Sequence, residues 1–326
     1  MSYSANLHTL PVVNWPLTAD LKAWPLSFDR DPKALAQSIK ELGLIQPLWG
    51  TLDEAGLPII VSGGLRLSAL RDLGYQEAPV RLFEAPKEEL WPWVLADNLS
   101  RSFNPAEIAR LWRAITLDLA SLSPERAQTL KNSLAASLGL PKNPKIQAQY
   151  LLASQLPDKI LLSLAREKLD LGAAARLAEM GQIGSNLWDL LEPNRPSLQS
   201  RKLWLEWLED LARAENRSIL EVAQEILNSK PSQNSKLEEP WDFGQRLRAR
   251  RFPKIAQMEL LRQKLLKALP LPSGSTLKLD PTFEDGSAEI RLTFATPEEL
   301  LAQTQALGRL TEDPQFLDLW RLPWPE

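Results

Sequence analysis

The sequence predicts an α+β protein that is predominantly helical and built in three parts. Short apolar runs alternate with amphipathic stretches up to residue 101, which is typical of an α/β domain. Stretches with helical periodicity then follow one another over residues 102–228. Near the C-terminus, between two further helical stretches, apolar and polar residues alternate with a period of two, as in a strand. A length of 326 residues favours two or three domains.

The expected N-terminal domain, residues 1–101, begins with an irregular leader of 28 residues that holds three Pro and two Trp. Asp31 and Pro32 then fit the N-cap and first position of a helix that Gly43 ends. We expect strands at residues 44–49, 57–61 and 79–83, and helices at 65–73 and 87–99.

The turn Ser62-Gly63-Gly64 joins an apolar strand to a helix, and this arrangement leaves backbone N–H groups free at the helix start. Such groups, together with the positive end of the helix dipole, form a site for an anion. Arg66 lies in the first turn, where a cation opposes the dipole by ~0.3–1 kcal/mol. A bound phosphate would reverse that cost, whereas the alternative is that Arg66 points to solvent.

The second expected domain, residues 102–228, is helical. Asn104-Pro105-Ala106-Glu107 predicts a capping box at the start of one helix. Leu203, Trp207, Leu208 and Leu211 share one stripe, with Trp204 beside it, and we interpret them as core. Further helices are expected at residues 124–138, 144–155, 157–168, 171–180 and within 183–228.

A helix ending at Leu138, a turn over residues 139–143 and a second helix have the outline of a helix-turn-helix motif. Lys142 and Lys145 stand at the start of the second helix, and Gln147 and Gln149 could contact base edges. The alternative is that the two helices are only a packing unit.

A polar, periodless linker is expected at residues 229–244, before a C-terminal domain at 245–326. Residues 245–269 carry eight basic side chains against Glu259, a net charge of +7 in a chain whose total is −3. This segregation favours a surface that binds a polyanion, and the alternative is a solvated helix face. The candidate DNA contacts there are Arg246, Arg248, Arg250, Arg251, Lys254, Arg262 and Lys264.

The C-terminal domain is expected to be a small α-β-β-α unit. Its helices are expected at residues 255–269 and 296–307, and its strands at 276–279 and 288–294, joined by a turn at 284–287. A unit of this size with an open strand edge is expected to dimerise.

Composition excludes several classes of site. The chain has no Cys and a single His, so disulfides, thiol nucleophiles, zinc fingers and His-clustered metal sites are unavailable. We expect His8 to be a solvated residue of the leader. No run of 18 apolar residues and no signal-peptide pattern occur, so we expect no membrane partner and a cytoplasmic protein.

Taken together, these segments resemble the ParB-type partition proteins of chromosomes and plasmids. Residues 60–69 are similar to the family's GERRxxA box, and residues 97–101 to its ENxxR box. Residues 28–48 resemble its first conserved segment, and residues 288–307 its dimerisation domain. The family fold has an α/β N-terminal domain, a helix-turn-helix domain and a C-terminal dimerisation unit.

The resemblance implies a dimeric clamp on double-stranded DNA that CTP and Mg²⁺ gate. By position, the nucleotide contacts would be Gln46, Gly63, Gly64, Arg66, Asn98 and Arg101. Asp97 and Asn98 would lie near the metal ion, because oxygen ligands suit Mg²⁺. The partner of the family is a ParA-type ATPase, which the ParB-type proteins contact through a basic N-terminal peptide. No Lys or Arg precedes Lys22 here, so we expect this chain to lack that peptide.

The chain also departs from the family pattern. Gly64 and Leu65 stand where the GERRxxA box has Glu and Arg, so whether it is a CTPase is uncertain. Asp97 and Arg101 are also spaced for a surface ion pair on one helix. Two alternatives therefore remain, a ParB-like scaffold or regulator without nucleotide and a ParB-like nuclease. Sulfiredoxin-type chemistry is excluded because there is no Cys.

Overall fold

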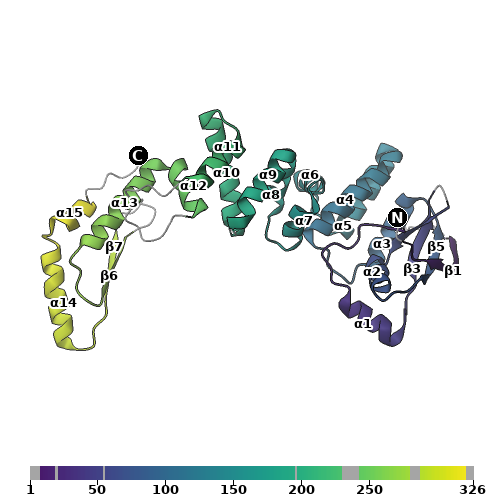
Figure 1. The fold of residues 1–326 in the computed structure, drawn as a ribbon, viewed down its shortest axis with the longest axis horizontal. Coiled ribbons are helices and arrows are strands. Elements are labelled where there is room, and N and C mark those ends of the chain that lie inside the picture. Colours follow the sequence, from purple (N-terminus) through teal and green to yellow (C-terminus); the bar gives the residue numbers. More distant parts are fainter. Residues whose placement is uncertain are drawn as a thin grey trace. The chain divides into compact units, whose positions relative to one another are not determined.

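The computed structural model describes residues 8–18, 21–53, 56–194, 197–229, 242–279 and 287–320 (Figure 1). Within it the chain forms two compact units, Met1–Leu205 and Glu206–Glu326, and the boundary falls inside helix α10 (Leu198–Glu215). The predicted fold class, a predominantly helical α+β protein, is confirmed. The domain boundaries at residues 101 and 228 stay predictions.

The first unit contains a five-stranded mixed sheet with the order β1-β5-β3-β4-β2. β1 pairs antiparallel with β5, and β5 pairs parallel with β3. β4 pairs antiparallel with β3 and parallel with β2. The strands are β1 (His8–Pro16), β2 (Lys22–Ala23), β3 (Leu48–Leu52), β4 (Pro58–Ser62) and β5 (Glu77–Glu84).

Two strand predictions were wrong. The leader is not irregular, because β1 and β2 form the two edges of the sheet. Pro11 and Pro16 are compatible with β1 because an edge strand can leave N–H positions unpaired. The strand expected at residues 44–49 begins only at Leu48, and Ile45 is 74% exposed in the turn before it.

Helices pack on both faces of this sheet, whose buried residues belong to two separate core clusters. α1 (Lys33–Leu42) and α2 (Gly64–Asp72) pack with Ile60 and Val80 in one core cluster. α3 (Lys87–Asp97) packs with Val61 and Phe83 in another. Since successive strand residues point to opposite faces, the neighbours Ile60 and Val61 serve different cores.

The remaining helices of this unit pack around α4 (Pro105–Asp118), whose Leu111, Trp112 and Ile115 are fully buried. Its predicted capping box is confirmed: Asn104 Oδ1 accepts from the Glu107 N–H, and Glu107 Oε2 accepts from the Asn104 N–H. The helices that follow are α5 (Pro124–Ser137), α6 (Pro144–Ala153), α7 (Asp158–Ala165), α8 (Leu171–Glu179) and α9 (Gln182–Leu191).

The predicted helix-turn-helix pair corresponds to α5 and α6, with Gly139 at φ 71° in the turn. α5 packs mainly on α3 and α4, whereas α6 packs on α4 and α8. The DNA-reading role of this pair stays a prediction. In the described part of the chain, no helix combines the length and apolar character needed to cross a membrane.

The described residues of the second unit contain the rest of α10 and the helices α11 (Ile219–Asn228), α12 (Phe243–Arg251), α13 (Pro253–Ala268), α14 (Pro297–Leu310) and α15 (Pro314–Trp320). Strands β6 (Ser275–Leu279) and β7 (Ala288–Leu292) form an antiparallel pair. Leu269, Leu310 and Leu319 are the buried centre of its terminal part. The predicted α-β-β-α order is confirmed, with α12 before it and α15 as an unforeseen last helix.

Some predictions fall outside the described residues. They are most of the linker, residues 230–241, the turn residues 284–286 and the side chain of His8. The last linker residues, 242–244, belong instead to the start of α12, where Asp242 accepts from the Gln245 N–H.

Candidate functional site

The predicted anion site lies at the start of α2. Gly63 has φ 95° and ψ 21°, a left-handed conformation that favours glycine, and no side chain caps the helix. A Cβ on Gly63 would also lie 2.9 Å from Leu48 Cδ2 and 3.1 Å from Arg66 Nε. The turn therefore requires glycine at position 63, and it leaves the first N–H groups of α2 without side-chain acceptors.

Arg66 does not point to solvent. Its side chain is 15% exposed, and Nη1 donates to the Gln46 carbonyl at 3.0 Å and to the Pro47 carbonyl at 2.9 Å. Nη2 lies 3.9 Å from Asp97 Oδ2. Burial lowers the pKa of the Arg66 guanidinium, against the attraction of Asp97. Arg66 thus joins the turn before β3 to the end of α3.

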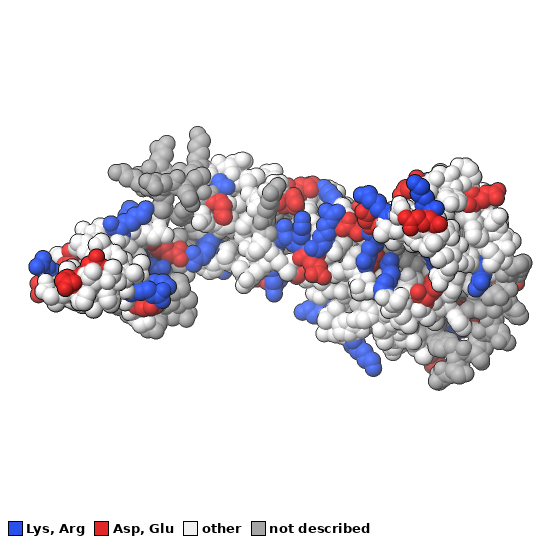
Figure 2. All heavy atoms as spheres, turned by 90° about the horizontal axis from the view of Figure 1, so that it is seen from below, with Lys and Arg blue, Asp and Glu red and all other residues white. Residues whose placement is uncertain are grey.

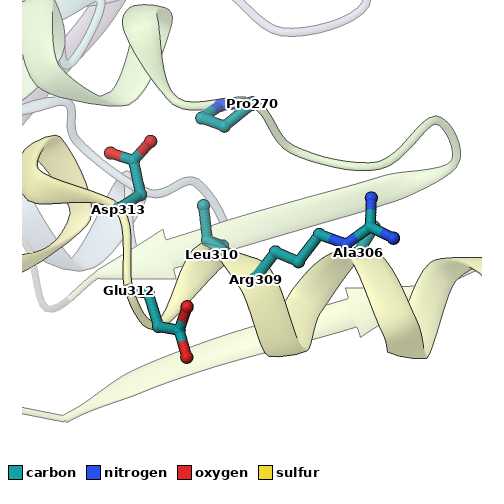
Figure 3. Close-up of a pocket in the computed structure, with 6 residues that line it drawn as sticks. All are labelled: Pro270, Ala306, Arg309, Leu310, Glu312 and Asp313. Atoms are coloured by element: carbon teal, nitrogen blue, oxygen red, sulfur yellow. The ribbon is translucent and has the colours of Figure 1, made fainter.

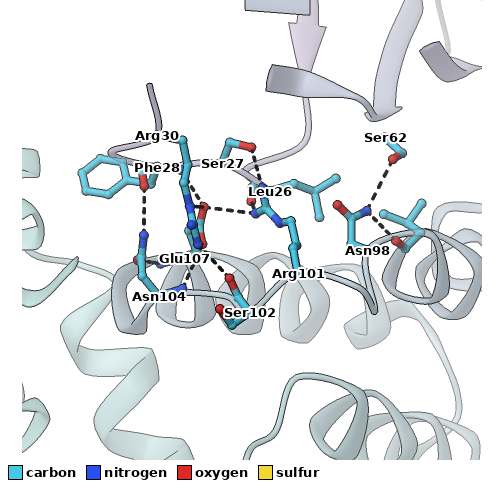
Figure 4. Close-up of polar contacts among 11 residues, drawn as sticks. Leu26, Ser27, Phe28, Arg30, Ser62, Asn98, Arg101, Ser102, Asn104 and Glu107 are labelled. Carbon is cyan, nitrogen blue, oxygen red and sulfur yellow. Dashed lines mark hydrogen bonds and ion pairs between the residues drawn. The ribbon is translucent and has the colours of Figure 1, made fainter. Parts of the chain in front are cut away.

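A chain of polar contacts joins Ser62 to the C-terminal end of α3. Ser62 Oγ donates to Asp97 Oδ2 at 2.6 Å. Asn98 Nδ2 donates to the Val94 carbonyl at 2.8 Å and more weakly, at 3.4 Å, to Ser62 Oγ (Figure 4). The structure therefore brings Arg66, Asp97 and Asn98 together, as the sequence predicted. We name this group, with Ser62 and Gly63, the glycine-turn cluster.

Arg101 belongs to a different cluster, which is centred on Glu107 (Figure 4). Its Nη2 donates to Glu107 Oε1 at 3.0 Å and to the Leu26 carbonyl, and its Nη1 donates to Ser27 Oγ at 3.2 Å. Its ion-pair partner is therefore Glu107, and the expected surface pair with Asp97 does not form. A role for Arg101 in phosphate binding stays a prediction that requires it to leave these partners.

Glu107 is a fully buried carboxylate with an exposed fraction of 0%. Arg30 binds it through Nε at 3.0 Å and Nη2 at 2.7 Å, and the Phe28 N–H adds a bond of 3.1 Å. Burial alone would raise the pKa of Glu107, but the bonds from Arg30, the Asn104 N–H, Arg101 and Phe28 outweigh it and lower that pKa. Glu107 is consequently held as an anion.

The glycine-turn cluster fits a phosphate better than a metal ion. Free N–H groups at a helix start and a guanidinium beside them suit phosphate oxygens. For Mg²⁺, the cluster offers the carboxylate of Asp97 and the amide oxygen of Asn98. Within the described residues no three Asp, Glu or His side chains gather to hold a metal.

The candidate DNA contacts of α6 are accessible. Lys142 and Lys145 are exposed at the start of the helix, where Asn143 Oδ1 accepts from the Lys145 N–H. Gln147 Nε2 donates to the Pro141 carbonyl, so this amide stabilises the turn. Gln149 is half-buried.

The arginines of the basic segment are engaged inside the second unit. Arg248 binds both carboxylate oxygens of Glu259 at 2.8 Å, and Arg250 binds those of Glu215 at 2.8 and 2.6 Å. Arg251 lies 3.1 Å from Asp210. The predicted basic surface is therefore interrupted by acidic partners, as the alternation of blue and red side chains in Figure 2 shows for one face.

The other basic side chains of the segment differ in whether they have bonding partners. Arg246 Nη1 donates to the Leu227 and Ser229 carbonyls at 3.1 and 2.8 Å, so it helps to cap α11. Lys254 and Lys264 are exposed and have no ion-pair partner among the described residues. Arg262 is half-buried on α13.

A surface cavity of about 350 Å³ lies in the second unit, between the end of α13 and the end of α14 (Figure 3). No predicted site residue lines it. Its lining residues are Pro270, Ala306, Arg309, Leu310, Glu312 and Asp313.

Comparison with known proteins gives a consistent relationship. No family model matches the chain. It is 31% identical over 147 residues, 45% of its length, to the probable chromosome-partitioning protein ParB of Treponema pallidum. It is 32% identical over 171 residues, 52% of its length, to the chromosome-partitioning protein Spo0J of Thermus thermophilus. The chain is a divergent relative of the ParB-type partition proteins. The matches cover 42% and 59% of those two proteins, about half of their length.

Solved ParB structures also align with this ParB-like chain, at low global similarity. The C-terminally truncated ParB of Caulobacter crescentus, complexed with CTP-γ-S, aligns over 52% of the chain and 92% of its own length, with 21% identity and a TM-score of 0.26. A Pnob8-like ParB-N domain aligns over 60% of the chain and 93% of its own length, with 14% identity and a TM-score of 0.38.

Sequence reasoning missed three residues of this ParB-like chain. Ser62 was seen only as a turn residue, although it is 1% exposed and bonded to Asp97. Glu107 was seen only as a capping residue, and Arg30, its partner 77 positions away, gave no signal. The sequence gives no local sign that Glu107 is buried, because an acidic residue in the first turn of a helix is common at exposed helix starts.

Proposed function

We propose that this ParB-like chain binds double-stranded DNA during the segregation of a chromosome or plasmid, and is associated with the nucleoid. The similarity to two chromosome-partitioning proteins, at 31% and 32% identity, is the observation that carries the proposal. It spans only about half of each relative, so the DNA contacts must be argued from this chain's own residues.

The proposed DNA contacts are lysines. Lys142 and Lys145 are exposed at the start of α6, and Lys254 and Lys264 are exposed on α13. Each can neutralise a phosphate without breaking an ion pair. Arg248, Arg250 and Arg251 would first have to leave Glu259, Glu215 and Asp210, so we assign them mainly to the stability of the second unit. Such binding depends steeply on salt concentration.

We further propose that the glycine-turn cluster binds CTP with Mg²⁺. The phosphates would lie at the N–H groups of Gly63 and Gly64 and beside Arg66, and Mg²⁺ would lie near Asp97 and Asn98. Gln46 would contribute through the position of its turn, because Arg66 donates a hydrogen bond to the Gln46 carbonyl. The first turn of α2 contains no carboxylate, so we propose binding and do not propose hydrolysis.

Dimerisation through the second unit would complete a two-fold clamp. β7 is an edge strand that exposes Ile290 at 38%, and Leu301 on α14 is 61% exposed. Phe294, just beyond β7, is 48% exposed. Apolar side chains beside an open strand edge favour pairing with a second copy. A ParA-type ATPase remains the expected partner by resemblance alone.

One observation favours a second candidate, a ParB-like scaffold or regulator that binds no nucleotide. The guanidinium groups of Arg66 and Arg101 are already bonded to protein acceptors. Calorimetric titration with CTP and Mg²⁺ separates the two functions: heat that Arg66→Ala abolishes supports the nucleotide site, and no heat with the wild type supports the scaffold. The nuclease alternative is less favoured, because among the described residues no three acidic or His side chains gather to hold a metal ion.

The DNA proposal is tested by electrophoretic mobility shift with duplex DNA at several salt concentrations. We expect a shift that weakens as salt increases, because counterion release drives binding. A wild-type protein that shifts no duplex at low salt would contradict the proposal. Plasmid incubated with the protein and Mg²⁺ should stay intact, and nicking would favour the nuclease.

A further inference from the structure

The carboxylate of Glu107 has more donors than it can use. Oε1 accepts from the Phe28 N–H, Arg30 Nε and Arg101 Nη2, and Oε2 accepts from Arg30 Nη2 and the Asn104 N–H. These are five donors on a group that offers about four lone-pair sites. One donor can therefore leave without exposing a bare buried charge.

The charges of this cluster do not balance. Arg30 and Arg101 together carry two positive charges against the single charge of Glu107. Asp29 is near, but it forms a bidentate pair with Arg166 at 2.8 Å and is neutralised there. Arg110 adds a further cation 4.8 Å from the ring of Phe28. Among the described residues, the positive charge of this cluster exceeds its negative charge, so the cluster would attract a bound anion.

Arg101 is the donor that can leave at the lowest cost. Arg30 holds Glu107 through two nitrogens, whereas Arg101 gives it one bond of 3.0 Å. The Nε of Arg101 is buried and has no hydrogen-bond partner, and an unsatisfied buried donor is costly. Arg101 also lies next to the glycine-turn cluster, because its N–H donates to the Asn98 carbonyl at 3.2 Å.

We propose that Arg101 exchanges partners when a phosphate group binds beside Asn98. In the free protein it contacts Glu107, Leu26 and Ser27, and in the bound protein it contacts the phosphate. Arg30 and the two backbone N–H groups keep Glu107 satisfied in both states. The proposal deepens the proposed function and rests on it, since the phosphate group is that of a nucleotide at the glycine-turn cluster.

The exchange couples ligand binding to the segment 26–30. Arg101 ties this segment to the end of α3 through the Leu26 carbonyl and the Ser27 hydroxyl. When Arg101 leaves, the segment keeps the bonds that Phe28, Asp29 and Arg30 make with their own partners, and the bond from the Leu26 N–H to the Trp24 carbonyl. If Arg101 has these two states, a substitution that weakens the hold on Arg101 in the free protein strengthens phosphate binding by at most the same factor.

The test is calorimetric titration of the full chain with tripolyphosphate, and separately with CTP and Mg²⁺. Ser27→Ala removes one acceptor of Arg101, so we expect phosphate to bind about threefold to tenfold more tightly. Arg30→Gln leaves Glu107 dependent on Arg101, so we expect binding about tenfold weaker. In the Arg101→Ala background both effects should vanish. Ser121→Ala, which removes an exposed hydroxyl on another helix turn, is the matched control.

Several results would overturn the exchange. They are tripolyphosphate binding that Arg101→Ala leaves unchanged, equal affinities for Ser27→Ala and the wild type, and no binding of tripolyphosphate by a folded wild type. In the first two cases CTP binding by the wild type would still support the nucleotide site. If tripolyphosphate gives the expected pattern but CTP gives no heat, Arg101 exchanges partners for a phosphate that is not part of CTP, and the nucleotide proposal fails. Circular dichroism of each variant verifies the fold.

Discussion

Ser62 Oγ donates a hydrogen bond of 2.6 Å to Asp97 Oδ2 and so joins the end of β4 to the end of α3. These two residues are 35 positions apart and lie in the two segments that resemble the conserved boxes of ParB-type proteins. The bond is short because its acceptor is a carboxylate. It holds the glycine turn against the residues proposed to lie near the metal ion.

Removal of this hydroxyl should lower stability. Ser62 is 1% exposed, so Ser62→Ala removes a buried donor from Asp97, whose side chain is 23% exposed. We expect the free energy of unfolding to fall by about 1–2 kcal/mol, measured by urea denaturation. Ser68→Ala is the control, because that hydroxyl is exposed and contacts only its own helix. Equal losses in the two variants would contradict this assignment.

Arg66 is expected to contribute to stability as well as to binding. Arg66→Ala leaves the Gln46 and Pro47 carbonyls without a donor, which should cost about 1–3 kcal/mol. Arg126→Ala removes a more exposed ion pair with Glu89 and should cost less than about 1 kcal/mol. Urea denaturation compares the two. A smaller loss of unfolding free energy in Arg66→Ala than in Arg126→Ala would show that the hydrogen bonds from Arg66 to the turn do not stabilise the fold.

Glu107 should make stability depend on acid pH. Its pKa in the folded protein is below the usual value of 4.5, so its contribution is complete above that value and is lost as the pH falls through the folded pKa. Glu107→Gln breaks a buried ion-pair cluster and should cost about 3 kcal/mol or more at pH 7.

The difference in the free energy of unfolding between the wild type and Glu107→Gln should therefore become smaller as the pH falls below 4.5. Denaturant titrations at pH 7, 5, 4 and 3 measure it. A difference that stays constant down to pH 3 would show that the carboxylate is not held as an anion by its arginine partners.

The lysines and arginines of the candidate DNA surface should behave differently. Lys142→Glu with Lys145→Glu should weaken duplex binding and reduce the slope of log affinity against log salt by about 1 for each phosphate that is no longer neutralised. Arg250→Ala should instead destabilise the second unit, because it releases Glu215 and Glu225. Mobility shifts and urea denaturation of both variants distinguish these outcomes. A loss of DNA binding in folded Arg250→Ala would contradict the assignment.

The sequence predicted helices better than strands, and the reasons are physical. Asn104 and Gly43 are local signals, because caps and left-handed turns depend on neighbouring residues. β1 was missed because Pro11 and Pro16 argue against a strand unless it lies at an edge, and position in a sheet is not a local property. The apolar Ile45 suggested a strand, yet it lies exposed in a turn.

The candidate site was only half predictable for a similar reason. Arg66, Asp97 and Asn98 were expected together through the family resemblance, and they are together. The engagement of Arg101 by Glu107 and of Arg250 by Glu215 depends on tertiary contacts. Ion pairs between residues 35 positions apart, such as Arg250 and Glu215, leave no periodic trace in a sequence. The basic segment consequently looked more available to DNA than it is.

Mapping of where the chain binds on its host's genome, by crosslinking and immunoprecipitation, tests the central claim most directly. A partition protein should occupy one compact group of sites near a replication origin or on a plasmid. Signal scattered evenly over the genome, or none above a control without the protein, would contradict a role in segregation.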